Sequence, residues 1–177
     1  MQALIAIDVQ NEFSNLGKRP VPNHAQFIKT INLHVLKVRE KGVPIAWVRH
    51  HNRPTESPAF IPGSWGFEFS ECFGPLLNND LEKEFQKDVY GAFTGTDLEQ
   101  WLRTLNIRDI LIVGFYTHGC VSTTAREGIM RDFNVSIDFY GTGSCDMLHE
   151  TLGRLTAEEA KRSALLHLEN MGVNIIT

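Results

Sequence analysis

The chain alternates short apolar runs with longer segments whose apolar residues recur at helical spacing. Its first apolar run, residues 4–7, is continuous, which is typical of a strand covered on both faces. Strands that alternate with helices connect through right-handed crossovers into a mostly parallel sheet. The sequence therefore predicts an α/β three-layer sandwich, with helices on both faces of a mostly parallel sheet.

Six short segments are the predicted strands: residues 4–7, 43–48, 85–89, 110–113, 135–139 and 173–176. Four longer segments are the predicted helices: residues 23–41, 96–106, 120–132 and 156–171. Asn23 is expected to cap the first helix and Gly42 to end it. Two later helices are expected to begin with a capping box, formed by Thr96 with Glu99 and by Thr156 with Glu159.

A segment at residues 50–80 breaks this rhythm, because prolines and glycines are interleaved there with aromatic residues. A long irregular segment inside a compact domain is typical of a lid, a binding loop or an interface. Packing of the aromatic side chains on the surface is the simpler alternative. With 177 residues in all, the chain has the usual length of one domain, so we expect a single domain over residues 1–177.

Charge and composition exclude several classes of partner and of protein. The net charge is −4 and no cluster of Lys or Arg forms a stripe, so we expect no nucleic-acid partner. No apolar run is long enough to span a membrane, and the N-terminal run lacks the basic flank of a signal peptide. Three cysteines without a Cys-x-x-Cys pair argue against a disulfide framework or a zinc knuckle. These features indicate a cytoplasmic protein with free thiols.

Three polar positions lie at or just past the ends of predicted strands: Asp8, Lys87 and the segment 114–120, which ends at Cys120. In parallel sheets, ligands bind outside the carboxyl ends of the strands, so these segments are expected to meet in one crevice. Taken alone, each residue has a simpler interpretation. Asp8 can cap a helix or pair with a cation, Lys87 can be a surface charge, and Cys120 can be a small buried residue.

Together the three residues can perform acyl transfer. Cys120 is expected to begin a helix, where amide dipoles and a nearby lysine stabilise a thiolate and lower the pKa of the thiol. Asp8 can accept the thiol proton, and Lys87 can hold the two acidic groups together. Backbone amides of the turn before Cys120 can bind the developing oxyanion.

Three segments in this order resemble the isochorismatase-like family of cysteine hydrolases. Residues 3–13 read ALIAIDVQNEF, like the family's first strand with its aspartate. Lys87 is followed at residues 91–98 by GAFTGTDL, and residues 112–121 read IVGFYTHGCV, like the family's nucleophile turn. The match covers residues 3 to about 139.

The resemblance implies a catalytic triad of Cys120, Lys87 and Asp8 on a parallel sheet of about six strands. It also implies a cis peptide bond between Phe115 and Tyr116, which would aim the amides of Tyr116 and Cys120 into one oxyanion hole. A homodimer or a homotetramer is the assembly that the resemblance implies.

The sequence also departs from its relatives. Nicotinamidases of this family carry an Asp-x-His pair and further histidines that bind a metal after the second strand, whereas this chain has His50 and His51 with no carboxylate between them. We therefore expect no metal and no other cofactor. True isochorismatases lack the nucleophilic cysteine, so Cys120 favours attack on a C–N bond over cleavage of a vinyl ether. Cys145, after the Gly-x-Gly at 141–143, is expected to be a packed or idle thiol.

The favoured hypothesis is an amidohydrolase that cleaves the C–N bond of a small amide or carbamoyl substrate. The alternatives are a catalytically idle member of the fold that binds a ligand or partner, a metal-dependent nicotinamidase, and a redox role for Cys120. The side chains expected to contact the substrate are Phe13, Arg49, His50, Trp65, Tyr116 and His118.

Overall fold

A computed structural model describes residues 2–53 and 55–177 of the chain. Its centre is a six-stranded sheet with the strand order β3-β2-β1-β4-β5-β8, and every neighbouring pair in it is parallel. The strands are β1 (Gln2–Ile7), β2 (Ile45–His50), β3 (Glu82–Lys87), β4 (Asp109–Phe115), β5 (Asn134–Gly143) and β8 (Asn174–Ile176). The predicted α/β class with a mostly parallel sheet is confirmed.

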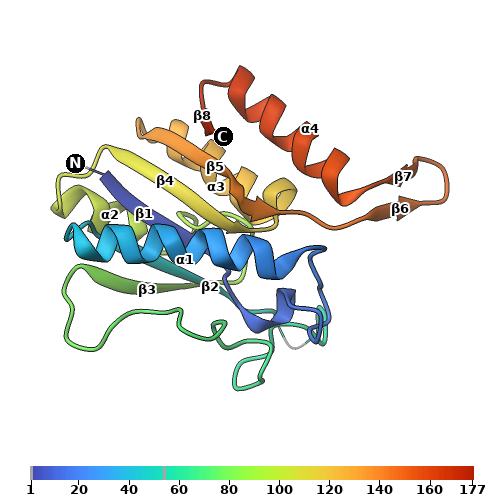
Figure 1. Cartoon of the computed structure of the whole chain (residues 1–177), viewed down its shortest axis with the longest axis horizontal. Coiled ribbons are helices and arrows are strands. Elements are labelled where there is room, and N and C mark those ends of the chain that lie inside the picture. The colour runs from blue at the N-terminus through green and yellow to red at the C-terminus, as the bar shows by residue number, and fades with distance from the viewer. Residues whose placement is uncertain (1, 54) are drawn as a thin grey trace.

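Helices cover both faces of this sheet (Figure 1). They are α1 (His24–Glu40), α2 (Leu98–Thr104), α3 (Ser122–Ile129) and α4 (Ala157–Asn170). Strand β1 shows how the layers form, because successive side chains of a strand point to opposite faces. Leu4 packs in a cluster with Ile31 and Val35 of α1, whereas Ile5 packs with Leu98 of α2 and with residues of α3 and α4. The helices thus form one layer of α1 and one of α2, α3 and α4.

Two segments lie outside this three-layer body. Residues 51–81 connect β2 to β3 without a helix or strand in their described part, and they lie below the sheet in Figure 1. The second segment is a hairpin of β6 (Met147–His149) and β7 (Gly153–Leu155), which the sequence did not predict. No helix in the described residues is long and apolar enough to cross a membrane.

Two of the expected helix caps are wrong. Asn23 precedes α1 in a left-handed conformation with φ of 60°, and its side chain makes no capping hydrogen bond. Thr96 does not form a capping box with Glu99, because α2 begins only at Leu98 and the Thr96 hydroxyl donates instead to the carbonyl of Ala92 at 2.6 Å. In both cases the residue type was right for a cap, but the backbone turns differently.

The capping box at Thr156 is confirmed, since its hydroxyl accepts from the amide of Glu159 and the Glu159 carboxylate accepts from the amide of Thr156 at 2.9 Å. We predict that Thr156→Ala lowers the free energy of unfolding by about 1 kcal/mol, because one amide of the first turn then loses its acceptor. Urea denaturation measures this change. Thr151→Ala, in an exposed turn, is the matched control and should leave the free energy nearly unchanged.

Candidate active site

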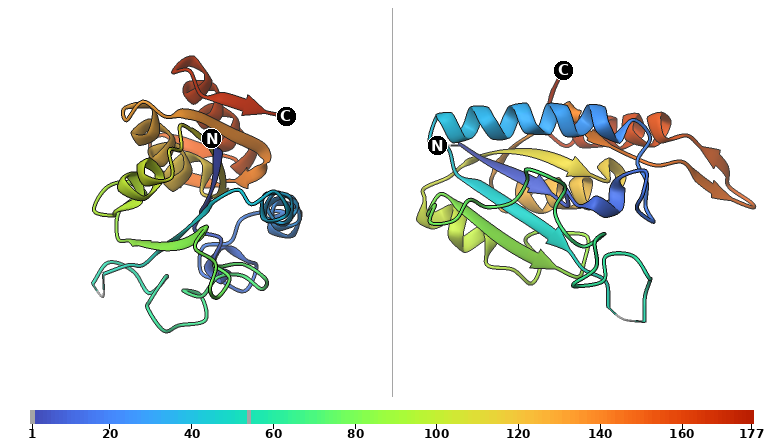
Figure 2. Two further views of the ribbon diagram at one scale, coloured as in Figure 1. Left: turned by 90° about the vertical axis from the view of Figure 1, so that its left-hand side faces the viewer. Right: turned by 60° about the horizontal axis from the view of Figure 1, so that its bottom comes forward.

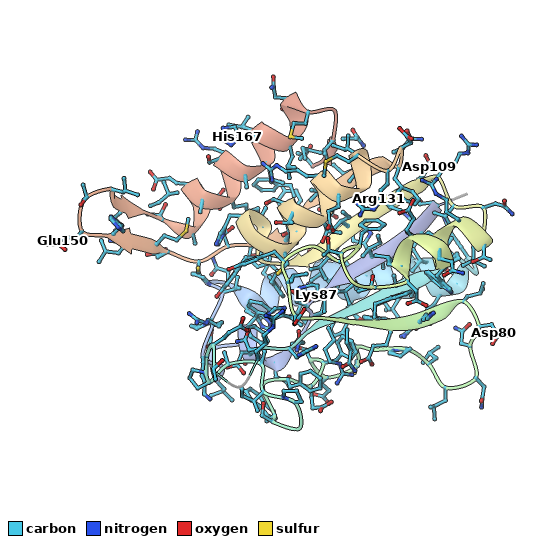
Figure 3. All side chains as sticks on the ribbon, turned by 180° about the vertical axis from the view of Figure 1, so that it is seen from behind. Asp80, Lys87, Asp109, Arg131, Glu150 and His167 are labelled. Atoms are coloured by element: carbon cyan, nitrogen blue, oxygen red, sulfur yellow. The ribbon has the colours of Figure 1, made fainter. Side chains whose placement is uncertain are left out.

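The side chains of Asp8, Lys87 and Cys120 meet at the carboxyl edge of the sheet. Asp8 directly follows β1, Lys87 ends β3, and β2 lies between these two strands. The Lys87 ammonium therefore reaches across β2, where it lies 2.8 Å from Asp8 Oδ2 and 3.2 Å from Cys120 Sγ. Figure 3 shows Lys87 inside the molecule, at the end of its strand. Three segments far apart in the sequence thus form one cluster.

Burial and charge set the protonation of this cluster. The side chains of Asp8 and Lys87 have no exposed surface. Burial opposes the positive charge of Lys87, but the attraction of Asp8 outweighs it and raises the pKa of the ammonium above its ordinary value. Burial, followed by the negative charge of Asp8, raises the pKa of the Cys120 thiol to about 12. At neutral pH the resting site therefore holds a neutral thiol beside a charged lysine.

The raised pKa corrects the expectation of a lowered one. That expectation rested on a helix start at Cys120, but Cys120 lies inside a five-residue turn, η2 (Thr117–Val121), and α3 begins only at Ser122. Lys87 does lower the thiol pKa, yet burial and Asp8 outweigh it. Asp8 Oδ1 has no hydrogen-bond partner in the described part of the chain, so this oxygen is free to accept the thiol proton.

The backbone before Cys120 is shaped by close packing and by a cis peptide bond. Gly114 has φ of 119°, and a Cβ there would lie 1.9 Å from the carbonyl oxygen of Ile7, so only glycine fits between β1 and β4. The peptide bond between Phe115 and Tyr116 is cis. The amides of Gly119 and Val121 both donate to the carbonyl of Tyr116, at 3.0 and 3.1 Å. These contacts fix a tight turn that presents Cys120 to the cavity.

Cys120 and Asp8 open into a cavity of about 840 Å³. Four of the side chains expected to contact a substrate line it: Phe13, His50, Tyr116 and His118. The rings of Tyr116 and His118 stack with centroids 5.1 Å apart, and burial lowers the pKa of His118, which favours a neutral imidazole. The lining residues that the sequence did not single out include Arg19, Asn52, Phe60, Tyr90, Thr123 and Met147.

Arg49 and Trp65, also expected to contact the substrate, do not line this cavity. Arg49 forms ion pairs with Glu68 and Glu84 at 3.1 and 2.9 Å, and it is adjacent to His50 on β2. Because neighbouring side chains of a strand point to opposite faces, the two cannot both face the cavity. Trp65 lies in the 51–81 segment with 52% of its surface exposed. Both predictions are corrected.

Two buried polar residues that follow Asp8 were missed. The Gln10 amide donates to the carbonyls of His50 and Phe67 at 3.0 and 2.8 Å, and its oxygen accepts from the amide of His50 at 2.9 Å. Glu12 accepts from the amide of Lys18 at 2.7 Å. Together these bonds tie the first loop to β2 and to the 51–81 segment. Their position just after Asp8, within the segment 3–13 that resembles the family's first strand, was the available signal.

The surroundings of His50 do not suit a divalent metal. Its Nδ1 lies 3.3 Å from the Lys87 ammonium, and its Nε2 pairs with Asn52 Oδ1 at 3.0 Å. A metal ion at Nδ1 would meet a positive charge, and one at Nε2 would have to displace Asn52. Among residues 2–53 and 55–177, no three His, Cys, Asp or Glu side chains gather closely enough to hold a metal. Burial and the charge of Lys87 lower the pKa of His50, so the imidazole is neutral at pH 7.

The raised thiol pKa leads to a prediction about alkylation. We expect the rate at which iodoacetamide labels Cys120 to keep rising with pH up to pH 10, because only the thiolate reacts and its fraction grows until the pKa is reached. Mass spectrometry of the peptide that contains Cys120 gives this rate, with exposed Cys72 as the internal comparison. A plateau below pH 8 would contradict the raised pKa.

The fold and the cavity are those of an α/β protein with its pocket at the carboxyl edge of a parallel sheet. A family model described as Isochorismatase domain matches residues 2–177, so the chain belongs to the isochorismatase family of hydrolases. Nicotinamidase 3 from Arabidopsis thaliana is 29% identical in an alignment that covers 87% of this chain and 77% of that protein. Ureidoacrylate amidohydrolase RutB from Cronobacter sakazakii is 28% identical, with coverage of 94% and 81%.

A solved structure supports the fold independently. The crystal structure of a cysteine hydrolase from Pseudomonas syringae pv. phaseolicola matches with a TM-score of 0.90 and covers 99% of this chain and 88% of that chain. Because only 22% of the residues are identical, this likeness shows the fold alone.

Proposed function

We propose that the protein is a cysteine-dependent amidohydrolase that cleaves the C–N bond of a small amide or carbamoyl compound. The observation that carries this proposal is the shared contact of one ammonium with a carboxylate and a thiol, 2.8 Å and 3.2 Å away, at the edge of a cavity of about 840 Å³. The names of the two amidohydrolase relatives support the same reaction class.

In the proposed reaction, the sulfur of Cys120 attacks the carbonyl carbon while its proton passes to Asp8. The charge that develops on the carbonyl oxygen is stabilised by the amides of Tyr116 and Cys120. Collapse of this intermediate breaks the C–N bond, and the leaving amine takes the proton from Asp8. Water then gives a proton to Asp8 and attacks the thioester, and the sulfur regains a proton as the acid departs.

Lys87 makes the transfer of the thiol proton to Asp8 easier at neutral pH. Its charge stabilises the thiolate and the Asp8 carboxylate, two groups that would otherwise repel each other in a buried site. A free thiol is needed throughout, and the three cysteines of the chain are unpaired. We therefore assign the enzyme to the reducing cytoplasm, as the sequence also indicated.

The substrate is expected to be small and partly apolar. Phe13, Phe60, Tyr90 and Tyr116 give the cavity aromatic walls, while neutral His118 offers a hydrogen bond near the nucleophile. Such a cavity holds one small molecule between aromatic rings and polar groups, which also include Arg19, Asn52 and Asp88.

The test is release of ammonia from a panel of small amides and ureido compounds, nicotinamide included, with mass spectrometry of the quenched enzyme. We expect at least one compound to release ammonia and to leave an acyl group on Cys120. Full activity in the presence of a chelator would argue against the metal-dependent alternative. No turnover of any compound, with tight binding of one of them, would favour the idle member of the fold instead.

A further inference from the structure

The active-site cavity is lined by one cationic side chain that the proposed reaction does not use. Among the described residues around this cavity, Arg19 alone carries a positive charge at neutral pH. The two histidines that line it, His50 and His118, are neutral, because burial lowers the pKa of each imidazole. The Arg19 guanidinium makes no ion pair within 4 Å with any described residue. Its charge is therefore available to a bound molecule.

Hydrogen bonds hold Arg19 in place at the cavity. Its backbone amide donates to the carbonyl of Glu12 at 3.1 Å, and its carbonyl accepts from the hydroxyl of Tyr116 at 2.8 Å. Its Nη2 donates to Ser57 Oγ at 3.3 Å, across to the 51–81 segment, which lies beside the loop that follows β1 (Figure 2). A guanidinium has five N–H donors, so most of them remain for a ligand. Such a pre-positioned donor binds at a lower entropic cost.

The carboxylates that line the cavity are engaged with other cations or donors. Asp8 pairs with Lys87, and Asp88 pairs with Arg53 at 2.8 Å. The Glu56 carboxylate accepts from the backbone amide of Arg53 at 2.9 Å, and the nearby guanidinium of Arg53 compensates its charge. The acidic groups of the cavity are thus neutralised locally, and a ligand anion would meet an uncompensated cation at Arg19.

Tyr116 connects Arg19 to the nucleophile turn. The backbone of Tyr116 lies in the turn that presents Cys120, and its hydroxyl reaches the backbone of Arg19. The ring between these two ends packs edge-on against Phe13, with centroids 4.8 Å apart, and both rings line the cavity. A molecule that extends from Cys120 to Arg19 therefore passes along aromatic surface, which suits a short apolar chain.

We propose that Arg19 determines the specificity of the site by binding a carboxylate of the substrate, while the amide at the other end of the substrate lies at Cys120. A guanidinium matches a carboxylate with two parallel N–H···O bonds, which makes it a selective partner for this group. The substrate class is thus a short carboxylic acid with a terminal amide, in preference to a neutral amide. Cleavage of this amide rests on the proposed function, whereas binding of the carboxylate does not.

Two acids and their neutral diamides test the preference. Succinamate and glutaramate differ by one methylene, and in succinamide and glutaramide an uncharged amide of the same shape replaces the carboxylate. The natural chain should hydrolyse at least one acid about tenfold or more faster, in kcat/KM, than its diamide. Arg19→Gln should lower kcat/KM for that acid about 10- to 100-fold, mainly through KM, and leave the diamide nearly unchanged. Arg19→Lys should recover part of the loss, because the charge remains without the paired geometry.

The neighbouring lysine provides a matched control. Lys18→Gln changes the net charge by the same amount, but the Lys18 ammonium donates to the carbonyl of Pro58 at 2.6 Å and does not line the cavity. This variant should keep the preference for the acid within about twofold, because salt screens charges that do not contact the ligand. A loss as large as that of Arg19→Gln would mean that general charge attracts the acid, and would overturn the direct contact.

Calorimetry with the Cys120→Ala protein separates binding from hydrolysis. One of the two acids should bind, and adding Arg19→Gln should weaken its binding about tenfold or more. If an acid binds in this Arg19-dependent way but the natural chain does not hydrolyse it, the carboxylate site stands and the proposed function fails. If the natural chain hydrolyses neutral amides as well as the acids, and Arg19→Gln changes neither, the proposed function stands and the role of Arg19 is overturned. Binding of neither acid overturns that role equally.

Discussion

Replacing Cys120 with alanine should reduce hydrolysis by at least about 1,000-fold, because the covalent route loses its nucleophile while the oxyanion site and the cavity remain. Serine should be nearly as inactive, because Asp8 would then have to deprotonate an alcohol, a far weaker acid than a thiol. The quantity to measure is kcat/KM for the best compound of the ammonia-release panel.

The fold should tolerate both changes at Cys120, since they remove or shorten only one small side chain beside the cavity. Thermal denaturation followed by circular dichroism checks this. Cys72→Ala is the matched control, because it removes a thiol that is exposed in the 51–81 segment, and it should leave kcat/KM unchanged. If the Cys120→Ala protein kept more than a few per cent of the natural activity, covalent catalysis would have to be abandoned.

The parallel sheet could be predicted because its central strands are continuous apolar runs. Strand β1 is buried from Ala3 to Ile7, as the pattern indicated. The edge strand β3 was harder to predict, since it begins at Glu82 and its only apolar residue is Phe85. An edge strand exposes polar groups to solvent, so its sequence loses the apolar signal on which the prediction depends. Strands β6 and β7, with three residues each, carry even less of this apolar signal.

The site predictions that depended only on strand topology were correct, and those that depended on side-chain orientation or burial were wrong. Asp8, Lys87 and Cys120 could be brought together because the carboxyl ends of parallel strands share one edge, a rule that needs no side-chain detail. Arg49 failed because residue type says nothing about which face of a strand a side chain occupies. The prediction of a lowered thiol pKa was wrong because it considered the helix dipole and Lys87 but not the burial of Cys120. Burial can be known only once the fold is known.

Removing the ammonium of Lys87 should strongly reduce both the stability and the activity of the protein. Lys87→Met leaves the Asp8 carboxylate buried without its cation, which should lower the free energy of unfolding by about 3 to 5 kcal/mol. Lys83→Met on the same strand is the matched control, because the Lys83 side chain is 40% exposed and its ion pair with Asp97 contributes little. Urea denaturation of the two variants gives the comparison.

A second substitution separates the role of Lys87 in stability from its role in catalysis. Lys87→Met combined with Asp8→Asn removes the uncompensated charge, so it should recover much of the stability lost by Lys87→Met alone, yet it should remain inactive because the proton acceptor is gone. In Lys87→Met alone, the thiol pKa should rise further, since the charge of Lys87 lowers it in the natural protein. Iodoacetamide should then label Cys120 more slowly at any given pH below 10. Labelling at the natural rate, in a protein shown to be folded, would mean that Lys87 does not act on the thiol.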